Sequence, residues 1–122
     1  MYNDAIEDYN NAIKWKPNDI NAYMNRGNAK YDLGLYEESI KDYDKIIKLD
    51  TNNVGAYYSR ANAKRELGLY KESIKDYDKA IYLNPNYSEA YNNRGLAKSD
   101  LGMYEEAIKD YKEVIELCED DA

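Results

Sequence analysis

The sequence predicts an all-α fold, an α–α superhelix of about seven helices packed as antiparallel hairpins. Two observations predict it: the sequence repeats with a constant period, and apolar residues follow helical spacing inside each repeat. The segment from Glu37 to Lys45 returns as Lys71 to Lys79 and again, with more changes, as Glu105 to Glu113. Each return comes 34 residues after the last. A period of roughly 20 to 50 residues indicates a solenoid of stacked units.

The repeat divides the chain into one half unit and three full units of two helices each. We predict a half unit, containing only the second helix, over residues 1–19, and full units over residues 20–53, 54–87 and 88–122. Asp19 and Ser88 stand where their side chains are expected to cap the helices that follow. A glycine closes the first helix of each full unit, where a residue free to adopt positive φ is favoured: Gly34, Gly68 and Gly102.

The two ends of this array pose a packing problem. A single helical hairpin cannot cover its own apolar side, so each unit depends on stacking against the next one. Residues 1–15 lack a partner helix and are expected to leave apolar surface open, as are Val114, Ile115 and Leu117 at the other end. Two interpretations stay open: the ends self-associate, or the sequence is a fragment of a longer protein.

Composition excludes several classes of function. The net charge is −7 and Lys and Arg form no cluster, which disfavours nucleic acid and anionic membranes as partners. Cys118 is the only cysteine and histidine is absent, which excludes disulfides within the chain, ordinary zinc sites and His-based catalysis. The carboxylates alternate with lysines on helix faces, so we expect no catalytic residue, no enzymatic activity, no metal and no cofactor. No signal-peptide or membrane-span pattern occurs, and the expected location is cytoplasmic.

Two sets of recurring residues are expected to belong to the scaffold. Most of the fifteen tyrosines fall at repeated positions and are interpreted as core; a stacking platform for nucleic-acid bases is disfavoured by the acidic charge. A pair of opposite charges also recurs, and an anion site at its arginines is disfavoured because strict recurrence is typical of scaffold positions. We hypothesise that these pairs join the two helices of each unit: Arg26 with Asp42, Arg60 with Asp76, and Arg94 with Asp110.

Small residues and prolines at fixed places in the repeat carry a resemblance to a known family. These places hold Gly27, Ala61 and Gly95; Ala5, Ser39, Ser73 and Ala107; Ala12, Ile46, Ala80 and Val114; and Pro17 and Pro85. The sequence resembles the tetratricopeptide repeat family over essentially the whole chain. It departs from the family pattern where aromatic residues, leucines and a proline are usual, at Lys30, Lys64 and Lys98, at Arg26, Arg60 and Arg94, and at Thr51. These departures change packing detail and leave the predicted fold intact.

The resemblance implies that the first helix of each hairpin lines a concave groove. The candidate groove residues are Asn21, Met24, Asn25, Asn28, Tyr31, Tyr58, Ser59, Asn62, Arg65, Asn92, Asn93 and Leu96. Asparagine recurs among them, Asn25 with Asn93 and Asn28 with Asn62, and a side-chain amide can both donate to and accept from a peptide bond. The pattern favours an extended peptide; the plainer interpretation is that asparagine is simply common in this chain.

Charge in the implied groove indicates which peptides it would prefer. The family's clamp for a terminal carboxylate is retained only at Asn28; its other places hold Met24, Ser59, Glu89 and Asn93. Four carboxylates face one guanidinium, which favours neutral or basic peptides over acidic tails: Asp32, Glu66, Glu89 and Asp100 against Arg65. We therefore predict a protein–protein interaction scaffold that binds an extended peptide or partner segment in the concave groove. The alternative is a structural self-association module that stacks or exchanges its open terminal helices to form a homo-oligomer.

Overall fold

A computed structural model describes residues 2–120, with side chains over residues 3–119. These residues form seven α-helices and no strand: α1 (Tyr2–Trp15), α2 (Ile20–Asp32), α3 (Tyr36–Leu49), α4 (Val54–Glu66), α5 (Tyr70–Leu83), α6 (Ser88–Asp100) and α7 (Tyr104–Asp120). The prediction of an all-α fold with about seven helices is confirmed.

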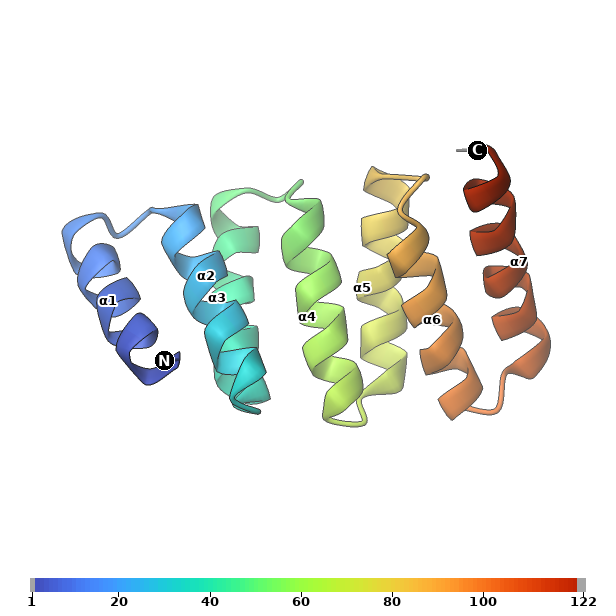
Figure 1. Ribbon diagram of the computed structural model, residues 1–122, viewed down its shortest axis with the longest axis horizontal. Helices are drawn as coiled ribbons and strands as arrows, with labels where there is room; N and C mark the ends of the chain where they lie inside the picture. The colour runs from blue at the N-terminus through green and yellow to red at the C-terminus, as the bar shows by residue number, and fades with distance from the viewer. Residues whose placement is uncertain (1, 121–122) are drawn as a thin grey trace.

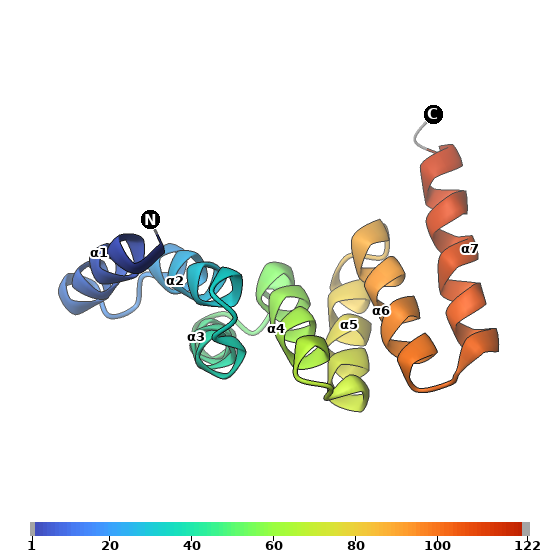
Figure 2. The ribbon, with the colours of Figure 1, turned by 60° about the horizontal axis from the view of Figure 1, so that its bottom comes forward.

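The helices lie in one row, from α1 at one end to α7 at the other, and successive helices run in opposite directions (Figure 1). Each helix packs against the helices that precede and follow it in the chain. The further contacts among the described helices join α2 to α4 and α4 to α6, so the first helices of the hairpins share one side of the array. The row is bowed, with α2, α4 and α6 toward its inner side (Figure 2).

The turns and caps follow the predicted residues with one exception. Asp19 caps α2, because its carboxylate accepts a hydrogen bond of 3.3 Å from a backbone N–H of the first turn. The predicted cap at Ser88 is wrong, since Ser88 is already the first residue of α6 and the preceding Tyr87 makes no side-chain capping bond. Asn53 caps α4 in the same way as Asp19 caps α2. The predicted positive φ is confirmed, at about 80°, for Gly34, Gly68 and Gly102.

Tyrosines fill the core of each hairpin and pack against very small residues. Tyr43 and Tyr77 are 1% and 0% exposed. Helix α2 can approach the first of these rings because Gly27 has no side chain; a Cβ at that position would lie 2.8 Å from Cε1 of Tyr43. The interpretation of the tyrosines as core does not extend to Tyr104, which is 65% exposed because no helix follows α7 in the described residues. Tyr2 falls outside the described side chains.

A salt-bridge cluster centred on a buried aspartate joins the two helices of each hairpin. Arg60 in α4 donates two hydrogen bonds to Asp76 in α5, from Nε at 2.8 Å and from Nη2 at 2.7 Å. Lys64 Nζ lies 3.1 Å from the same carboxylate. The hypothesised pairing is confirmed in all three hairpins, since the same two bonds join Arg26 to Asp42 and Arg94 to Asp110.

Each arginine also reaches back to the preceding unit. The Nη1 group of Arg60 donates to Asp44 of α3 at 2.8 Å, and Arg94 donates to Asp78 in the same way. In the first hairpin the acceptor is neutral, because the Oδ1 atom of Asn10 occupies that place. One guanidinium therefore joins three helices, which couples the packing within a hairpin to the stacking of hairpins.

Both ends of the array expose apolar side chains. Trp15 at the end of α1 is 85% exposed, and Ile115 on α7 is 58% exposed. Val114 and Leu117, expected to be open as well, are half-buried because α6 covers that side of α7. The expected packing problem therefore affects different faces of the two terminal helices.

Candidate peptide-binding groove

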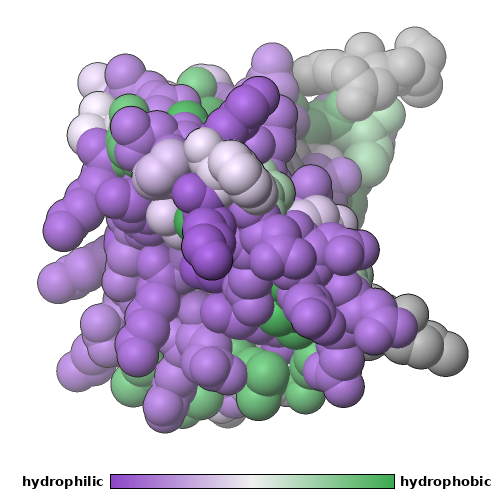
Figure 3. Space-filling model, turned by 90° about the vertical axis from the view of Figure 1, so that its left-hand side faces the viewer, coloured by the Kyte–Doolittle hydropathy of each residue, from purple (hydrophilic) through white to green (hydrophobic). Residues whose placement is uncertain are grey.

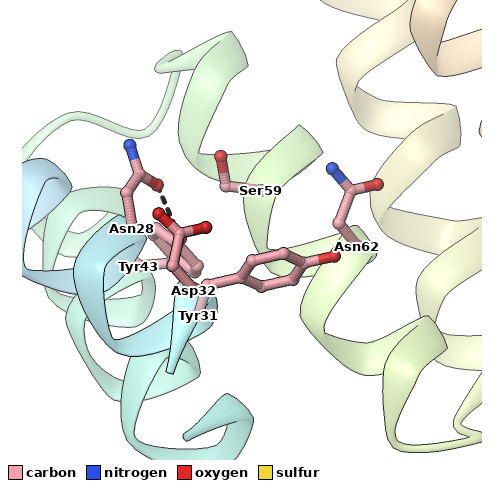
Figure 4. Close-up of a pocket in the computed structure, with 6 residues that line it drawn as sticks. All are labelled: Asn28, Tyr31, Asp32, Tyr43, Ser59 and Asn62. Atoms are coloured by element: carbon pink, nitrogen blue, oxygen red, sulfur yellow. Dashed lines mark hydrogen bonds between the residues drawn. The ribbon is translucent and has the colours of Figure 1, made fainter. Parts of the chain in front are cut away.

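A small hollow opens between α2 and α4 on the inner side of the array. Its volume is about 190 Å³, and six residues line it: Asn28, Tyr31, Asp32, Tyr43, Ser59 and Asn62 (Figure 4). Tyr31 extends from α2 toward Asn62 on α4, across the mouth of this hollow (Figure 4). Four of the residues assigned to the groove from the sequence thus meet at one place.

Core tyrosines hold two asparagines in fixed positions. The hydroxyl of Tyr43 donates a hydrogen bond of 2.7 Å to Oδ1 of Asn28, and the hydroxyl of Tyr77 donates to Oδ1 of Asn62. Burial raises the pKa of both tyrosines, so the hydroxyls stay protonated and remain donors. Each amide was expected both to donate to and to accept from a peptide. Because the carbonyl oxygen already accepts a hydrogen bond from the core, only the NH₂ group can serve a ligand.

The amides of the last unit bond within the groove wall. Asn93 Nδ2 donates to the hydroxyl of Tyr58 at 2.9 Å and to Oδ1 of Asn62 at 3.1 Å, while Asn92 donates to Asn93. Asn25, which occupies the same repeat position as Asn93, is exposed. The two differ because Asn93 bonds to side chains of α4, the first helix of the preceding unit, and no such helix lies before α2 in the described residues. The asparagine amides along the groove wall are therefore not equivalent to one another.

Arg65 brings a buried donor to this wall. Its Nε atom is buried and has no hydrogen-bond partner among the described residues. The guanidinium lies beside the Tyr77 hydroxyl, and the neighbouring Glu66 lies near Tyr31 of α2, where burial and then this carboxylate raise the tyrosine pKa. A buried N–H without a partner costs about 1–3 kcal/mol.

The remaining predicted groove residues divide between surface and core. Asn21 and Leu96 are exposed, Leu96 to 38%. Met24 instead packs against the core of the first hairpin, and its Cε lies 3.5 Å from where a Cβ of Gly55 would stand. Met24 therefore contributes more to packing between units than to the groove surface.

Sequence reasoning missed the tyrosines that anchor the asparagines. The available indication was a coupled recurrence: Tyr43 follows Asn28 by 15 residues, and Tyr77 follows Asn62 by the same interval. In the last unit Leu96 replaces the asparagine, and the hydroxyl of Tyr111 lies 3.4 Å from Oγ of Ser99 instead. The tyrosine hydroxyl therefore bonds to the asparagine where one is present and lies near another polar side chain where it is not.

Family models match nearly the whole sequence. A model described as a tetratricopeptide repeat matches residues 88–121, and a model described as a TPR repeat matches residues 1–34, 27–68 and 61–102. The chain belongs to the tetratricopeptide repeat family. TPR proteins are typically scaffolds for protein interactions, and membership of the family supports an interaction scaffold as the role of this chain. A search of curated protein sequences finds no significant match.

Solved structures share this TPR fold. The crystal structure of MamA is 29% identical and superposes with a TM-score of 0.91 over 95% of this chain and 68% of MamA. The second TPR of Spaghetti (RPAP3), bound to the HSP90 peptide SRMEEVD, is 35% identical, with a TM-score of 0.77 over 80% of this chain and 91% of that one. MamA 41-end from Desulfovibrio magneticus RS-1, 18% identical with a TM-score of 0.92, shares the fold over 98% of this chain and 67% of its own.

The described helices lack membrane-spanning character and a metal-ligand cluster. Within residues 2–120, no helix combines the length and apolar character needed to cross a bilayer. Over the same part of the chain, His, Cys, Asp and Glu side chains form no group of three that could hold a metal ion.

Proposed function

We propose that this TPR chain binds an extended segment of a partner protein along α2, α4 and α6, and prefers neutral or basic segments. The observation that carries the proposal is the hollow between α2 and α4, where core tyrosines fix Asn28 and Asn62 through their carbonyl oxygens. A fixed NH₂ group can bond a peptide carbonyl with little further loss of side-chain entropy. The peptide bound to the RPAP3 TPR, at 35% identity, supports a peptide as the class of ligand.

Charge separates this groove from one that binds an acidic tail. The peptide SRMEEVD, held by the RPAP3 TPR, ends in a cluster of carboxylates. In this chain Asp32, Glu66, Glu89 and Asp100 are all exposed on the first helices, and Arg65 is half-buried. Unpaired carboxylates repel an acidic ligand and attract a basic one, so the same fold is expected to serve a ligand of different charge.

The charge preference can be measured with three unstructured peptides of equal length that are neutral, basic and acidic. We expect the basic peptide to bind about tenfold more tightly than the acidic one at low salt, by fluorescence anisotropy, and the difference to shrink as salt rises. The Asp32→Asn, Glu66→Gln variant should lose this preference. A matched control, Glu116→Gln with Glu119→Gln, removes the same charge from exposed positions on α7 and should keep it.

A second variant tests the amide donor. Asn28→Ala should weaken the neutral peptide about fivefold, since one hydrogen bond contributes about 1 kcal/mol, whereas Asn11→Ala on α1 should leave binding unchanged. Equal binding of acidic and basic peptides would exclude the charge preference. Unchanged binding by both groove variants would exclude the groove itself.

Self-association is a second candidate function, favoured by the open side of α7. Ile108 and Ile115 are 51% and 58% exposed, whereas the same positions in α3 and α5 are half-buried against the next hairpin. Two copies that pair through α7 would cover these side chains. Light scattering should then show a mass that rises with concentration, and Ile108→Lys with Ile115→Lys should return it to that of one chain. A constant single-chain mass in the unmodified protein would count against this candidate.

A further inference from the structure

The hollow between α2 and α4 has a counterpart one repeat later, between α4 and α6. The residues at the six equivalent positions are Asn62, Arg65, Glu66, Tyr77, Asn93 and Leu96. The buried tyrosine is kept, and at both places its hydroxyl donates to an asparagine. Arg65 stands at the position of Tyr31, and Glu66 at that of Asp32. The two places share a framework and differ in the side chains that enter it.

At the second place the chain supplies a cation of its own. The guanidinium of Arg65 lies beside the Tyr77 hydroxyl, and its Nε atom is buried. Burial opposes the charge of this group, yet the Tyr77 hydroxyl and then the carboxylate of Glu66 raise the pKa of Arg65 above its ordinary value. A buried tyrosine with a carboxylate at this repeat position therefore accommodates a guanidinium.

At the first place the equivalent space is open, because Tyr31 is held away from it. Its ring packs edge-on against Tyr36, with 5.1 Å between the ring centroids, and extends toward Asn62 (Figure 4). Glu66 of the next unit lies near its hydroxyl. The hollow of about 190 Å³ remains beside it. A ligand side chain can therefore enter here, where one repeat later an arginine of the chain is already present.

Asp32 gives this hollow a negative charge that the chain does not neutralise. Its side chain is exposed and lines the hollow together with Tyr43 and Ser59 (Figure 4). None of the six lining residues is cationic, and within the described residues Asp32 forms no salt bridge. Ser59 adds a hydroxyl that can accept a hydrogen bond. The hollow thus combines two tyrosine rings, a free carboxylate and a second acceptor.

An arginine side chain suits this combination better than other side chains do. A carboxylate would be repelled by Asp32, and an apolar group would remove water from Asp32 without replacing its hydrogen bonds. The methylene stem of arginine can lie along a tyrosine ring, and its planar guanidinium both stacks on aromatic faces and donates two parallel bonds to a carboxylate. Lysine has the charge without the planar fork, and its ammonium is more strongly hydrated.

We infer that the hollow between α2 and α4 binds one arginine side chain of the partner segment. Its guanidinium pairs with Asp32, packs against Tyr31 and lies beside the Tyr43 hydroxyl, as Arg65 lies beside Tyr77. This inference rests on the proposed function, because the segment must run along the same helices. It adds selectivity: the asparagine amides bond to a main chain that all segments share, whereas the hollow requires one particular residue.

The test must separate arginine from positive charge in general. The chain has a net charge of −7 and its α1 end is mostly hydrophilic (Figure 3), so any basic peptide is attracted to much of the surface. The probes are three otherwise identical, neutral peptides with arginine, lysine or citrulline at the centre. Lysine keeps the net charge of the arginine peptide, and citrulline keeps the shape of arginine without its charge.

We expect the arginine peptide to bind about fivefold more tightly than the lysine peptide and about tenfold more tightly than the citrulline peptide, by fluorescence anisotropy. Asp32→Asn should remove both differences. Asp100→Asn makes the same change at the equivalent exposed position of α6 and should keep them. Equal binding of the arginine and lysine peptides to the unmodified protein would overturn the inference.

A variant that imitates the next unit tests the hollow from inside. Tyr31→Arg should place a guanidinium in the hollow, so the arginine and citrulline peptides should bind this variant equally. Tyr31→Phe keeps the ring and should keep the preference for arginine. A preference that survives both Asp32→Asn and Tyr31→Arg would show that the arginine binds elsewhere. If the citrulline peptide still binds and Asn28→Ala still weakens it, the proposed function stands in that case.

A small probe tests the hollow without the rest of the groove. N-acetylarginine N-methylamide at millimolar concentration should shift the side-chain amide signals of Asn28 and Asn62 in NMR spectra, saturably, and the citrulline analogue should not. The shifts should disappear in Asp32→Asn. If none of the peptides binds, the proposed function fails and this probe decides the hollow: saturable shifts support an arginine site, and their absence overturns it.

Discussion

Replacing Tyr77 with alanine is expected to lower the free energy of unfolding by about 4 kcal/mol. The ring is fully buried, and its neighbours in the core include Ala61, Ala80, Ala90 and Ala97. Side chains this short cannot move into the vacated space, so a cavity remains and its cost adds to the lost apolar burial. Urea denaturation followed by circular dichroism measures the change.

Two companion variants separate the contributions of Tyr77. Tyr77→Phe keeps the ring and removes the hydrogen bond to Asn62, which still accepts from Asn93, so we expect a loss of about 1 kcal/mol. Tyr82 lies on the same helix and is 78% exposed, so Tyr82→Ala is expected to cost less than about 1 kcal/mol. Similar losses for Tyr77→Ala and Tyr82→Ala would contradict the core role of Tyr77.

The sequence predicted the helices and turns because local signals specify them. A glycine such as Gly34, with φ of 80° at the end of α2, is required by the backbone of the turn alone. The pairing of Arg26 with Asp42 was also predictable, since both residues recur with the period and carry opposite charge. Prediction succeeded where a single residue type, or a recurring pair, is sufficient to produce the feature.

The details of the groove depend on contacts between helices, which spacing does not reveal. The sequence predicts a free side-chain amide at Asn28, but its carbonyl oxygen accepts a hydrogen bond from Tyr43. The sequence also predicts Met24 as a groove residue, but Met24 packs against the core. Asn93 and Asn25 behave differently because Asn93 bonds to Tyr58 and Asn62 of the preceding first helix, and the described residues include no such helix before α2. The caps have a similar cause: Asn53 lies directly before α4 and can reach its first turn, whereas Ser88 is already the first residue of α6.

Asp76→Ala is expected to lower the free energy of unfolding by about 3 kcal/mol, because it leaves two cations without their buried partner. The Asp76 side chain is 8% exposed, and both Arg60 and Lys64 contact it, at 2.7 and 3.1 Å. Their own side chains are 18% and 15% exposed, so water replaces the lost carboxylate poorly. Thermal or urea denaturation of the variant measures this loss.

Asp44 provides the matched control, because it contacts the same arginine from a different environment. Its side chain is 51% exposed and lies 2.8 Å from Nη1 of Arg60, so Asp44→Ala is expected to cost less than about 1 kcal/mol. The charge swap Arg26→Asp with Asp42→Arg should recover part of the loss caused by either reversal alone. Recovery stays incomplete because Lys30 lies 3.5 Å from the position of the new arginine. Equal losses from Asp44→Ala and Asp76→Ala would contradict the larger contribution expected from the buried carboxylate.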